Sequence, residues 1–211
     1  MLRVVPTHRS EDPRLDKYLA KRRFTITPEP TGGKTAKTSK KGMPPRFVIQ
    51  KHDATRLHYD VRLEVNGVLV SWAVPKGPSM DPTAKRLAVM TEDHPMDYAG
   101  FEGYIPKGEY GGGPVIVWDA GLYHNLTADK RGRVLPMPVG IEQGHIKVWL
   151  EGEKLQGAWA LTRTDGRQWL MVKVKDAAAD ADLDPVRDEP ASILTGKTIE
   201  EINASPRAAT T

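Results

Sequence analysis

The stretch FVIQKHDATRLHYDVRLEVNG, residues 47–67, decides the fold that the sequence predicts. Its second half alternates strictly between two kinds of residue: His58, Asp60, Arg62 and Glu64 are polar, whereas Tyr59, Val61, Leu63 and Val65 are apolar. Because successive side chains of a strand point to opposite faces of a sheet, this pattern predicts a strand over 57–65 with one apolar and one charged surface. The Asn66-Gly67 pair that follows is typical of a tight hairpin.

The rest of the chain contains further short strands separated by turn residues. Besides 57–65, we expect strands over 46–51, 68–74, 86–92, 114–118, 145–150, 156–164 and 168–174. Asp165-Gly166, between the last two, predicts a second hairpin. About eight short strands at this spacing predict a mainly β protein, a small closed antiparallel β-barrel.

The flanking segments differ in composition from the strands. Residues 12–23 predict a short N-terminal helix, with Asp12 as its cap and Pro13 in its first turn. Residues 27–45 are rich in Gly, Pro, Thr and Lys, which is typical of a flexible arm. We therefore expect three parts: an N-terminal helix and basic arm over 1–45, the barrel over 46–175, and an acidic then low-complexity tail over 176–211 with one short helix.

Composition excludes several classes of site. The chain has 211 residues and no cysteine, so any metal must be held by His, Asp, Glu or water. No stretch of about 18 apolar residues predicts a membrane span, and no apolar secretory segment opens the chain, so we expect a cytoplasmic protein. Basic residues without an acidic neighbour cluster over 34–51. This segment is either a contact for nucleic-acid phosphates or a solvated lysine-rich loop.

The charged face of 57–65 is the candidate metal site. His58 and Asp60 share this face, and His52 precedes them close to the neighbouring strand. Two imidazoles and a carboxylate suit Zn²⁺, Fe²⁺ or Mn²⁺, and positions left open on the metal would accept water and a phosphate oxygen. The alternative is an ordinary amphipathic strand with its charged face in water, for which histidine is an unusual residue.

Other candidate residues carry chemistry suited to phosphate. The guanidinium of Arg62 matches phosphate oxygens geometrically. Further cations and a histidine that could exchange protons near neutral pH follow along the chain: Lys76, Lys85, Arg86 and His94, with Tyr98 nearby. Together with a metal, they are typical of phosphoryl transfer to water. We expect the five tryptophans to pack in the core rather than stack on bases.

Three stretches resemble the 3′-phosphoesterase domain of bacterial DNA ligase D: residues 47–82, residues 85–98 (KRLAVMTEDHPMDY) and residues 101–121 (FEGYIPKGEYGGGPVIVWDAG). The resemblance implies a small barrel with a polar groove and an activity that prefers Mn²⁺, with Co²⁺ or Zn²⁺ as other candidate ions. It implies removal of a 3′ ribonucleotide and then a 3′-phosphate from DNA or RNA–DNA primer-templates. It also suggests a monomer near the nucleoid, with Ku and an end-joining ligase or polymerase as partners.

By the family's motifs, the metal ligands are His52, His58 and Asp60. Catalytic or phosphate-binding roles fall on Arg62, Lys76, Arg86, His94 and Tyr98, and binding of the substrate end falls on Arg22 and Glu29. This chain has Arg23 where the family has an aspartate that supports ribonucleotide removal. A guanidinium has no hydrogen-bond acceptor, so we expect faster removal of a 3′-phosphate than of a 3′ ribonucleotide.

Two other functions remain open at this stage. A non-catalytic module that binds DNA ends would keep the groove without turnover, but the complete set of polar residues argues against it. A metal-binding barrel that hydrolyses small phosphoesters is the third possibility, and the basic segment over 34–51 favours a polyanionic substrate instead.

Overall fold

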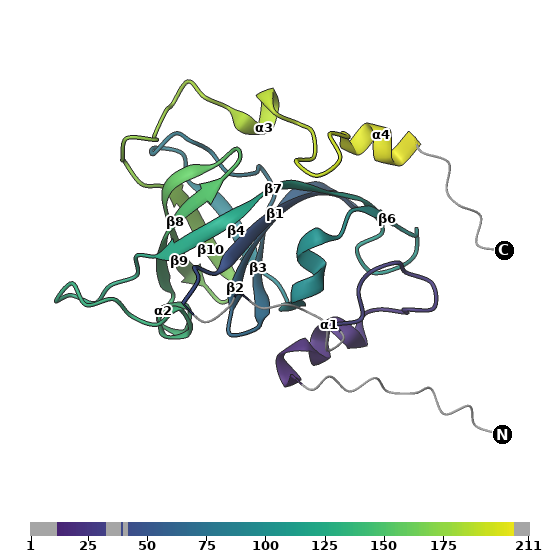
Figure 1. Ribbon diagram of the computed structural model, residues 1–211, viewed down its shortest axis with the longest axis horizontal. Helices are drawn as coiled ribbons and strands as arrows, with labels where there is room; N and C mark the ends of the chain where they lie inside the picture. The colour runs from purple at the N-terminus through teal and green to yellow at the C-terminus, as the bar shows by residue number, and fades with distance from the viewer. Residues whose placement is uncertain (1–11, 33–38, 40–41, 205–211) are drawn as a thin grey trace.

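A computed structural model of the chain describes residues 12–32, 39 and 42–204 (Figure 1). Its strands are β1 (Arg46–Asp53), β2 (Leu57–Val65), β3 (Val68–Val74), β4 (Arg86–Met90), β5 (His94–Pro95), β6 (Gly103–Ile105), β7 (Gly113–Asn125), β8 (His145–Gly152), β9 (Gln156–Asp165) and β10 (Gln168–Lys173). Its helices are η1 (Pro13–Leu15), α1 (Asp16–Ala20), η2 (Met96–Gly100), α2 (Met137–Gln143), α3 (Pro185–Asp188) and α4 (Ile199–Ala204). No helix in these ranges is long and apolar enough to cross a membrane.

Eight strands close into an antiparallel barrel. They are hydrogen-bonded in the order β1-β2-β3-β4-β10-β9-β8-β7, and β7 pairs back onto β1. These eight strands are the predicted ones, so the predicted fold class is confirmed. Two short strands lie outside the closed ring, since β5 pairs with β3 and β6 pairs with β7.

Strand β7 is much longer than the predicted strand over 114–118. The apolar run ends at Asp119, which predicts the end of a strand, yet this carboxylate is fully buried. It accepts hydrogen bonds from the backbone N–H groups of Glu153, Lys154 and Leu155. The neighbouring loop therefore satisfies a charge that the sequence pattern places in solvent, and the strand continues.

The two faces of β2 separate as the alternation predicts. Tyr59, Val61 and Leu63 point into the barrel, where Trp72, Trp118, Trp159 and Trp169 are also buried. The hairpin turn follows as expected, with positive φ angles of 49° at Asn66 and 86° at Gly67. Four of the five tryptophans thus pack in the core, and Trp149 is 36% exposed.

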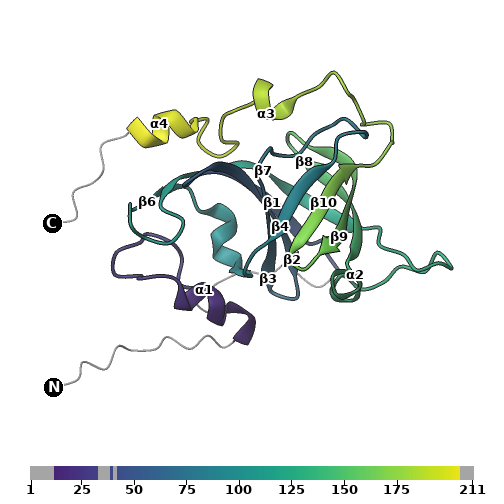
Figure 2. The same cartoon turned by 180° about the vertical axis from the view of Figure 1, so that it is seen from behind.

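The polar face of β2 is buried too, because a second layer covers the outside of the barrel wall. A second apolar cluster joins Val48, Leu69 and Val117 of the barrel to Tyr18 of α1 and Tyr98 of η2. In Figures 1 and 2, α1 and η2 lie against the outside of the barrel, far from α2. The polar side chains of the wall are therefore enclosed between the barrel and this layer.

The described parts of the flanking segments contain two helices that the sequence predicts. The Asp12 carboxylate accepts the backbone N–H of Arg14 as a helix cap, but α1 ends at Ala20, before the predicted 12–23 helix would end. In the tail, the predicted short helix is α4, whose buried Ile199 lies against the barrel. Most of the basic residues over 34–51 lie outside the described residues.

Candidate active site

Strand register brings the three predicted metal ligands together. His52 of β1 is directly opposite His58 of β2, and Asp60 follows two residues later on the same face. The Oδ2 atom of Asp60 lies 3.7 Å from His52 Nδ1 and 3.7 Å from His58 Nε2. One ligand atom from each residue lies within 4.8 Å of the others. These separations are too long for hydrogen bonds and fit atoms that surround one ion.

Backbone carbonyls set the orientation of both imidazoles. His52 donates from Nε2 to the Gly111 carbonyl over 2.7 Å, and His58 donates from Nδ1 to the Arg56 carbonyl over 2.8 Å. In each neutral ring, the other nitrogen then carries a lone pair that faces Asp60. Histidines that bind metals usually donate their second N–H in this way, which fixes the tautomer. The donor set therefore fits a divalent ion.

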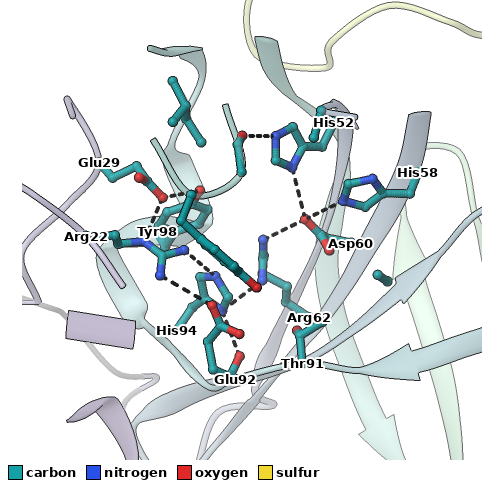
Figure 3. Close-up of a pocket in the computed structure, with 15 residues that line it drawn as sticks. Arg22, Glu29, His52, His58, Asp60, Arg62, Thr91, Glu92, His94 and Tyr98 are labelled. Atoms are coloured by element: carbon teal, nitrogen blue, oxygen red, sulfur yellow. Dashed lines mark hydrogen bonds and ion pairs between the residues drawn. The ribbon is translucent and has the colours of Figure 1, made fainter. Parts of the chain in front are cut away.

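Arg62 connects the predicted metal ligands to the rest of the pocket (Figure 3). Its Nη2 donates to Asp60 Oδ2 over 2.9 Å, and its Nε donates to the Gln50 side-chain oxygen over 2.7 Å. Gln50 in turn donates to the carbonyls of Tyr98 and Phe101. Burial opposes ionisation of Asp60, but the adjacent Arg62 guanidinium is the main favourable contact, and the pKa of Asp60 lies well below its usual value.

The N-terminal arm supplies the opposite wall of the pocket. Arg22 Nε donates to Glu29 Oε1 over 2.8 Å, and Tyr98 donates to the same oxygen over 3.0 Å. Arg22 also pairs with Glu92 at 3.3 Å. The side chains of Arg22 and Glu29 are 4% and 0% exposed, so these charges are compensated inside the protein.

His94 lies between two guanidinium groups. Its Nδ1 lies 2.9 Å from the Glu92 carbonyl oxygen and 3.0 Å from Arg62 Nη1, and its Nε2 lies 3.3 Å from Arg22 Nη2. Burial, reinforced by the charges of Arg62 and Arg22, lowers the pKa of His94 well below its usual value. This lowered pKa favours a neutral imidazole that can accept a hydrogen bond, and the expected proton exchange by His94 near neutral pH stays a prediction.

The pocket has a volume of about 220 Å³ and is lined by most of the predicted residues: Arg22, Glu29, His52, His58, Asp60, Arg62, His94 and Tyr98. Lys76 and Arg86 do not line it. Lys76 is exposed, and Arg86 shares its strand face with Ala88, which lies in the barrel core. Their roles at this site therefore stay predictions, since position along the chain does not reveal which face of β4 a residue occupies.

Arg23 is also placed differently from the expectation. Its guanidinium forms an ion pair with Glu109, in the loop over 106–112, and it does not line the pocket.

Several residues of the site were missed from the sequence. Gln50 precedes His52 by two residues in the predicted strand, so strand alternation could have placed it on the same face. Glu92, Tyr110 and Gly111 carry no such local signal. They reach the pocket through loops, whose paths a periodic pattern does not specify.

Comparisons with known proteins agree with this architecture. The sequence model of one protein family, the DNA ligase D 3′-phosphoesterase domain, matches residues 50–163 of this chain. Over 191 residues, 88% of this chain, the sequence is 49% identical to the multifunctional non-homologous end joining protein LigD of Pseudomonas aeruginosa, of which it spans 22%. It is 46% identical over 166 residues to the LigD protein of Mycolicibacterium smegmatis, and 45% identical over 163 residues to that of Mycobacterium tuberculosis.

Each of the two latter alignments covers 77% of this chain and about a fifth of the relative. The chain thus corresponds to one part of much longer proteins, and the segment that matches the family model, residues 50–163, contains the predicted metal ligands and runs from within β1 into β9. The chain belongs to the DNA ligase D 3′-phosphoesterase domain family.

Proposed function

We propose that this protein is a metal-dependent phosphoesterase that removes phosphate from the 3′ ends of DNA or RNA–DNA primer-templates during end joining. The observation that carries the proposal is the convergence of His52, His58 and Asp60, whose ligand atoms lie within 4.8 Å of one another. The relatives' names associate their whole proteins with non-homologous end joining. A cytoplasmic location near the nucleoid, and Ku with a ligase or polymerase as partners, belong to the same proposal.

In this mechanism, His52, His58 and Asp60 hold one divalent ion. Such an ion supplies a Lewis acid for a phosphate oxygen and lowers the pKa of bound water. We propose Mn²⁺, although Co²⁺ and Zn²⁺ also accept two imidazoles and a carboxylate. Water attacks phosphorus, the bond between phosphorus and the 3′ oxygen breaks, and that oxygen takes a proton to become the 3′ hydroxyl.

The chain's own residues bind and orient the phosphate. Arg62 and Arg22 present N–H donors from two sides of the pocket, and their charges favour the dianion. His94 is held as a neutral acceptor, and burial raises the pKa of Tyr98 well above its usual value, so its hydroxyl stays protonated and can donate. The proposed catalytic groups that line the pocket are Arg62, His94 and Tyr98, and Lys76 and Arg86 are further proposed phosphate contacts.

Arg22 and Glu29 have the proposed role of shaping the site for the terminal nucleotide. A 3′ ribonucleotide presents a diester and a 2′ hydroxyl that requires an acceptor. Residue 23 pairs with Glu109 outside the pocket, so the family's aspartate has no counterpart there that could accept this hydroxyl, and we expect slower removal of a 3′ ribonucleotide than of a 3′-phosphate. The two rates are measured on primer-templates that differ only in this end group, and their ratio tests the expectation.

The direct test is Mn²⁺-dependent release of phosphate from a primer-template with a 3′-phosphate. His58→Ala is the preferred variant, because Asp60 is also the counter-ion of Arg62 and its removal leaves a buried charge unpaired. We expect Mn²⁺ binding to weaken by about a hundredfold, as is typical of disturbed metal sites, and turnover to fall with it. The exposed His145 is the matched control, as His145→Ala.

A non-catalytic module that binds DNA ends, the alternative function, predicts a different outcome. Under that alternative, the wild-type protein binds the primer-template without releasing phosphate at any Mn²⁺ concentration. That result, or full activity of His58→Ala at low Mn²⁺, contradicts the proposed function.

A further inference from the structure

One aromatic side chain of the pocket is exposed. Tyr110 lines the same pocket as His52 and Asp60, and it is 48% exposed. The other aromatic ring of this lining, Tyr98, is 2% exposed and makes a hydrogen bond with Glu29. An open aromatic ring beside a phosphate-binding pocket is unusual for a purely structural residue, because no core surrounds it.

The ring of Tyr110 is held in place by the N-terminal arm. Lys21 Nζ donates to the Tyr110 hydroxyl over 3.0 Å, and the same ammonium lies 4.3 Å from the ring centroid. The guanidinium of Arg22 lies 5.6 Å from that centroid. Lys21 is itself paired with Glu92 at 2.9 Å. Cations at these distances attract the face of an aromatic ring, so the arm fixes its orientation.

The loop that carries Tyr110 is fixed to the metal site. Arg23 pairs with Glu109 on one side of Tyr110, and the carbonyl of Gly111 on the other side accepts from His52. The loop is tightly folded at Gly112, where an added Cβ would lie 2.8 Å from the Pro106 carbonyl oxygen. The position of the ring is therefore tied to a predicted metal ligand.

We propose that Tyr110 stacks on the nucleobase of the terminal nucleotide whose 3′-phosphate enters the pocket. This inference rests on the proposed function, since it takes the occupant of the pocket to be a 3′ nucleotide end. Aromatic rings bind unpaired or frayed bases without sequence preference, because every base has a π-face. A single ring at this place recognises the end nucleotide of any sequence, which suits an enzyme that acts on broken ends.

The first experiment measures stacking without catalysis. A primer-template with 2-aminopurine as its 3′-terminal base, ending in a 3′-phosphate, is titrated with the full chain in EDTA. We expect quenching of the 2-aminopurine fluorescence by the wild-type protein and by Tyr110→Phe, which keeps the ring. Tyr110→Ala loses this quenching at protein concentrations that saturate binding. Equal quenching by Tyr110→Ala and wild type overturns the proposal.

The second experiment compares rates on two ends. In one primer-template the terminal nucleotide that bears the 3′-phosphate has a normal base. In the other, an abasic deoxyribose takes its place. For Tyr110→Ala we expect kcat/KM to fall roughly tenfold to a hundredfold on the first end, the range for loss of one base-stacking contact, and to change little on the abasic end. Equal losses on both ends overturn the proposal, because they indicate a disturbed metal site.

Trp149 provides the matched control for removing an exposed aromatic ring. It lies on β8 and is 36% exposed, and Trp149→Ala should leave both the quenching and the ratio of rates unchanged. The two experiments also separate this inference from the proposed function. If no 3′-phosphate is released by wild-type protein with Mn²⁺, the proposed function fails, whereas the fluorescence titration in EDTA still decides whether Tyr110 contacts the base.

Discussion

Both faces of β2 are largely buried, but they are stabilised differently. Val61 and Leu63 on the inner face are 2% and 1% exposed, and Asp60 and Arg62 on the outer face are 6% and 2% exposed. The inner face is stabilised by apolar area, which is non-directional. The outer face depends on directional hydrogen bonds, each of which requires one partner in one place. Burial alone therefore does not separate the residues that fold this protein from those that form its site.

The largest expected effect tests the inner face. Leu63→Ala removes a buried side chain and leaves a cavity among the tryptophans, so we expect the free energy of unfolding to fall by about 2–5 kcal/mol. Urea titration measures the change. Leu57→Ala, at the exposed start of the same strand, is the control and should alter stability by less than about 0.5 kcal/mol. Similar losses in both variants would remove the distinction between interior and surface.

Gln50→Leu tests the buried hydrogen bonds that stabilise the outer face. The substitution keeps the side chain's approximate size but deprives Arg62 and the carbonyls of Tyr98 and Phe101 of their partner. We expect the free energy of unfolding to fall by about 1–3 kcal/mol, which is the cost of leaving buried polar groups without partners. Because Arg62 loses an orienting contact, kcat/KM on a 3′-phosphate should also fall. Gln156→Leu, at an exposed position of β9, should change neither quantity.

A smaller effect concerns pH. Burial and two guanidinium groups lower the pKa of His94, so the unfolded chain binds a proton at this residue more readily than the folded protein. Its contribution to stability is complete above the ordinary histidine pKa of about 6.5 and is lost as pH falls below that value. In metal-free buffer, His94→Asn should flatten the fall in Tm between about pH 7.5 and pH 5.5. The exposed His124 is the control, since His124→Asn should keep the wild-type slope.

The smallest effect is expected at Arg23. Its side chain is 65% exposed and pairs with Glu109 outside the pocket, so Arg23→Asp alone should barely change the ratio of phosphate to ribonucleotide removal. The substitution places two carboxylates together, which should loosen the loop over 106–112. Arg23→Asp combined with Glu109→Lys restores opposite charges. A large gain in ribonucleotide removal by Arg23→Asp alone would show that residue 23 reaches the substrate.

Local patterns in the sequence determined the barrel strands and half of the site. Alternation over 57–65 assigned Val61 and Leu63 to the interior, and it placed His58, Asp60 and Arg62 on one face. Such patterns succeed because a strand has a fixed period of two residues, so each residue's face follows from its neighbours. Asn66-Gly67 likewise specified its hairpin through the positive φ angles that such a turn needs.

Tertiary structure alone decided what covers that face. Arg22 lies 70 residues from its partner Glu92, and Tyr98 lies 69 residues from Glu29. No local period relates residues so far apart, because their meeting depends on where the arm docks on the finished barrel. The same docking makes His94 a neutral acceptor, directs Arg23 to Glu109, and leaves Tyr110 exposed at the pocket. The sequence determined which residues share a strand face, and the long-range packing determined which of them share a site.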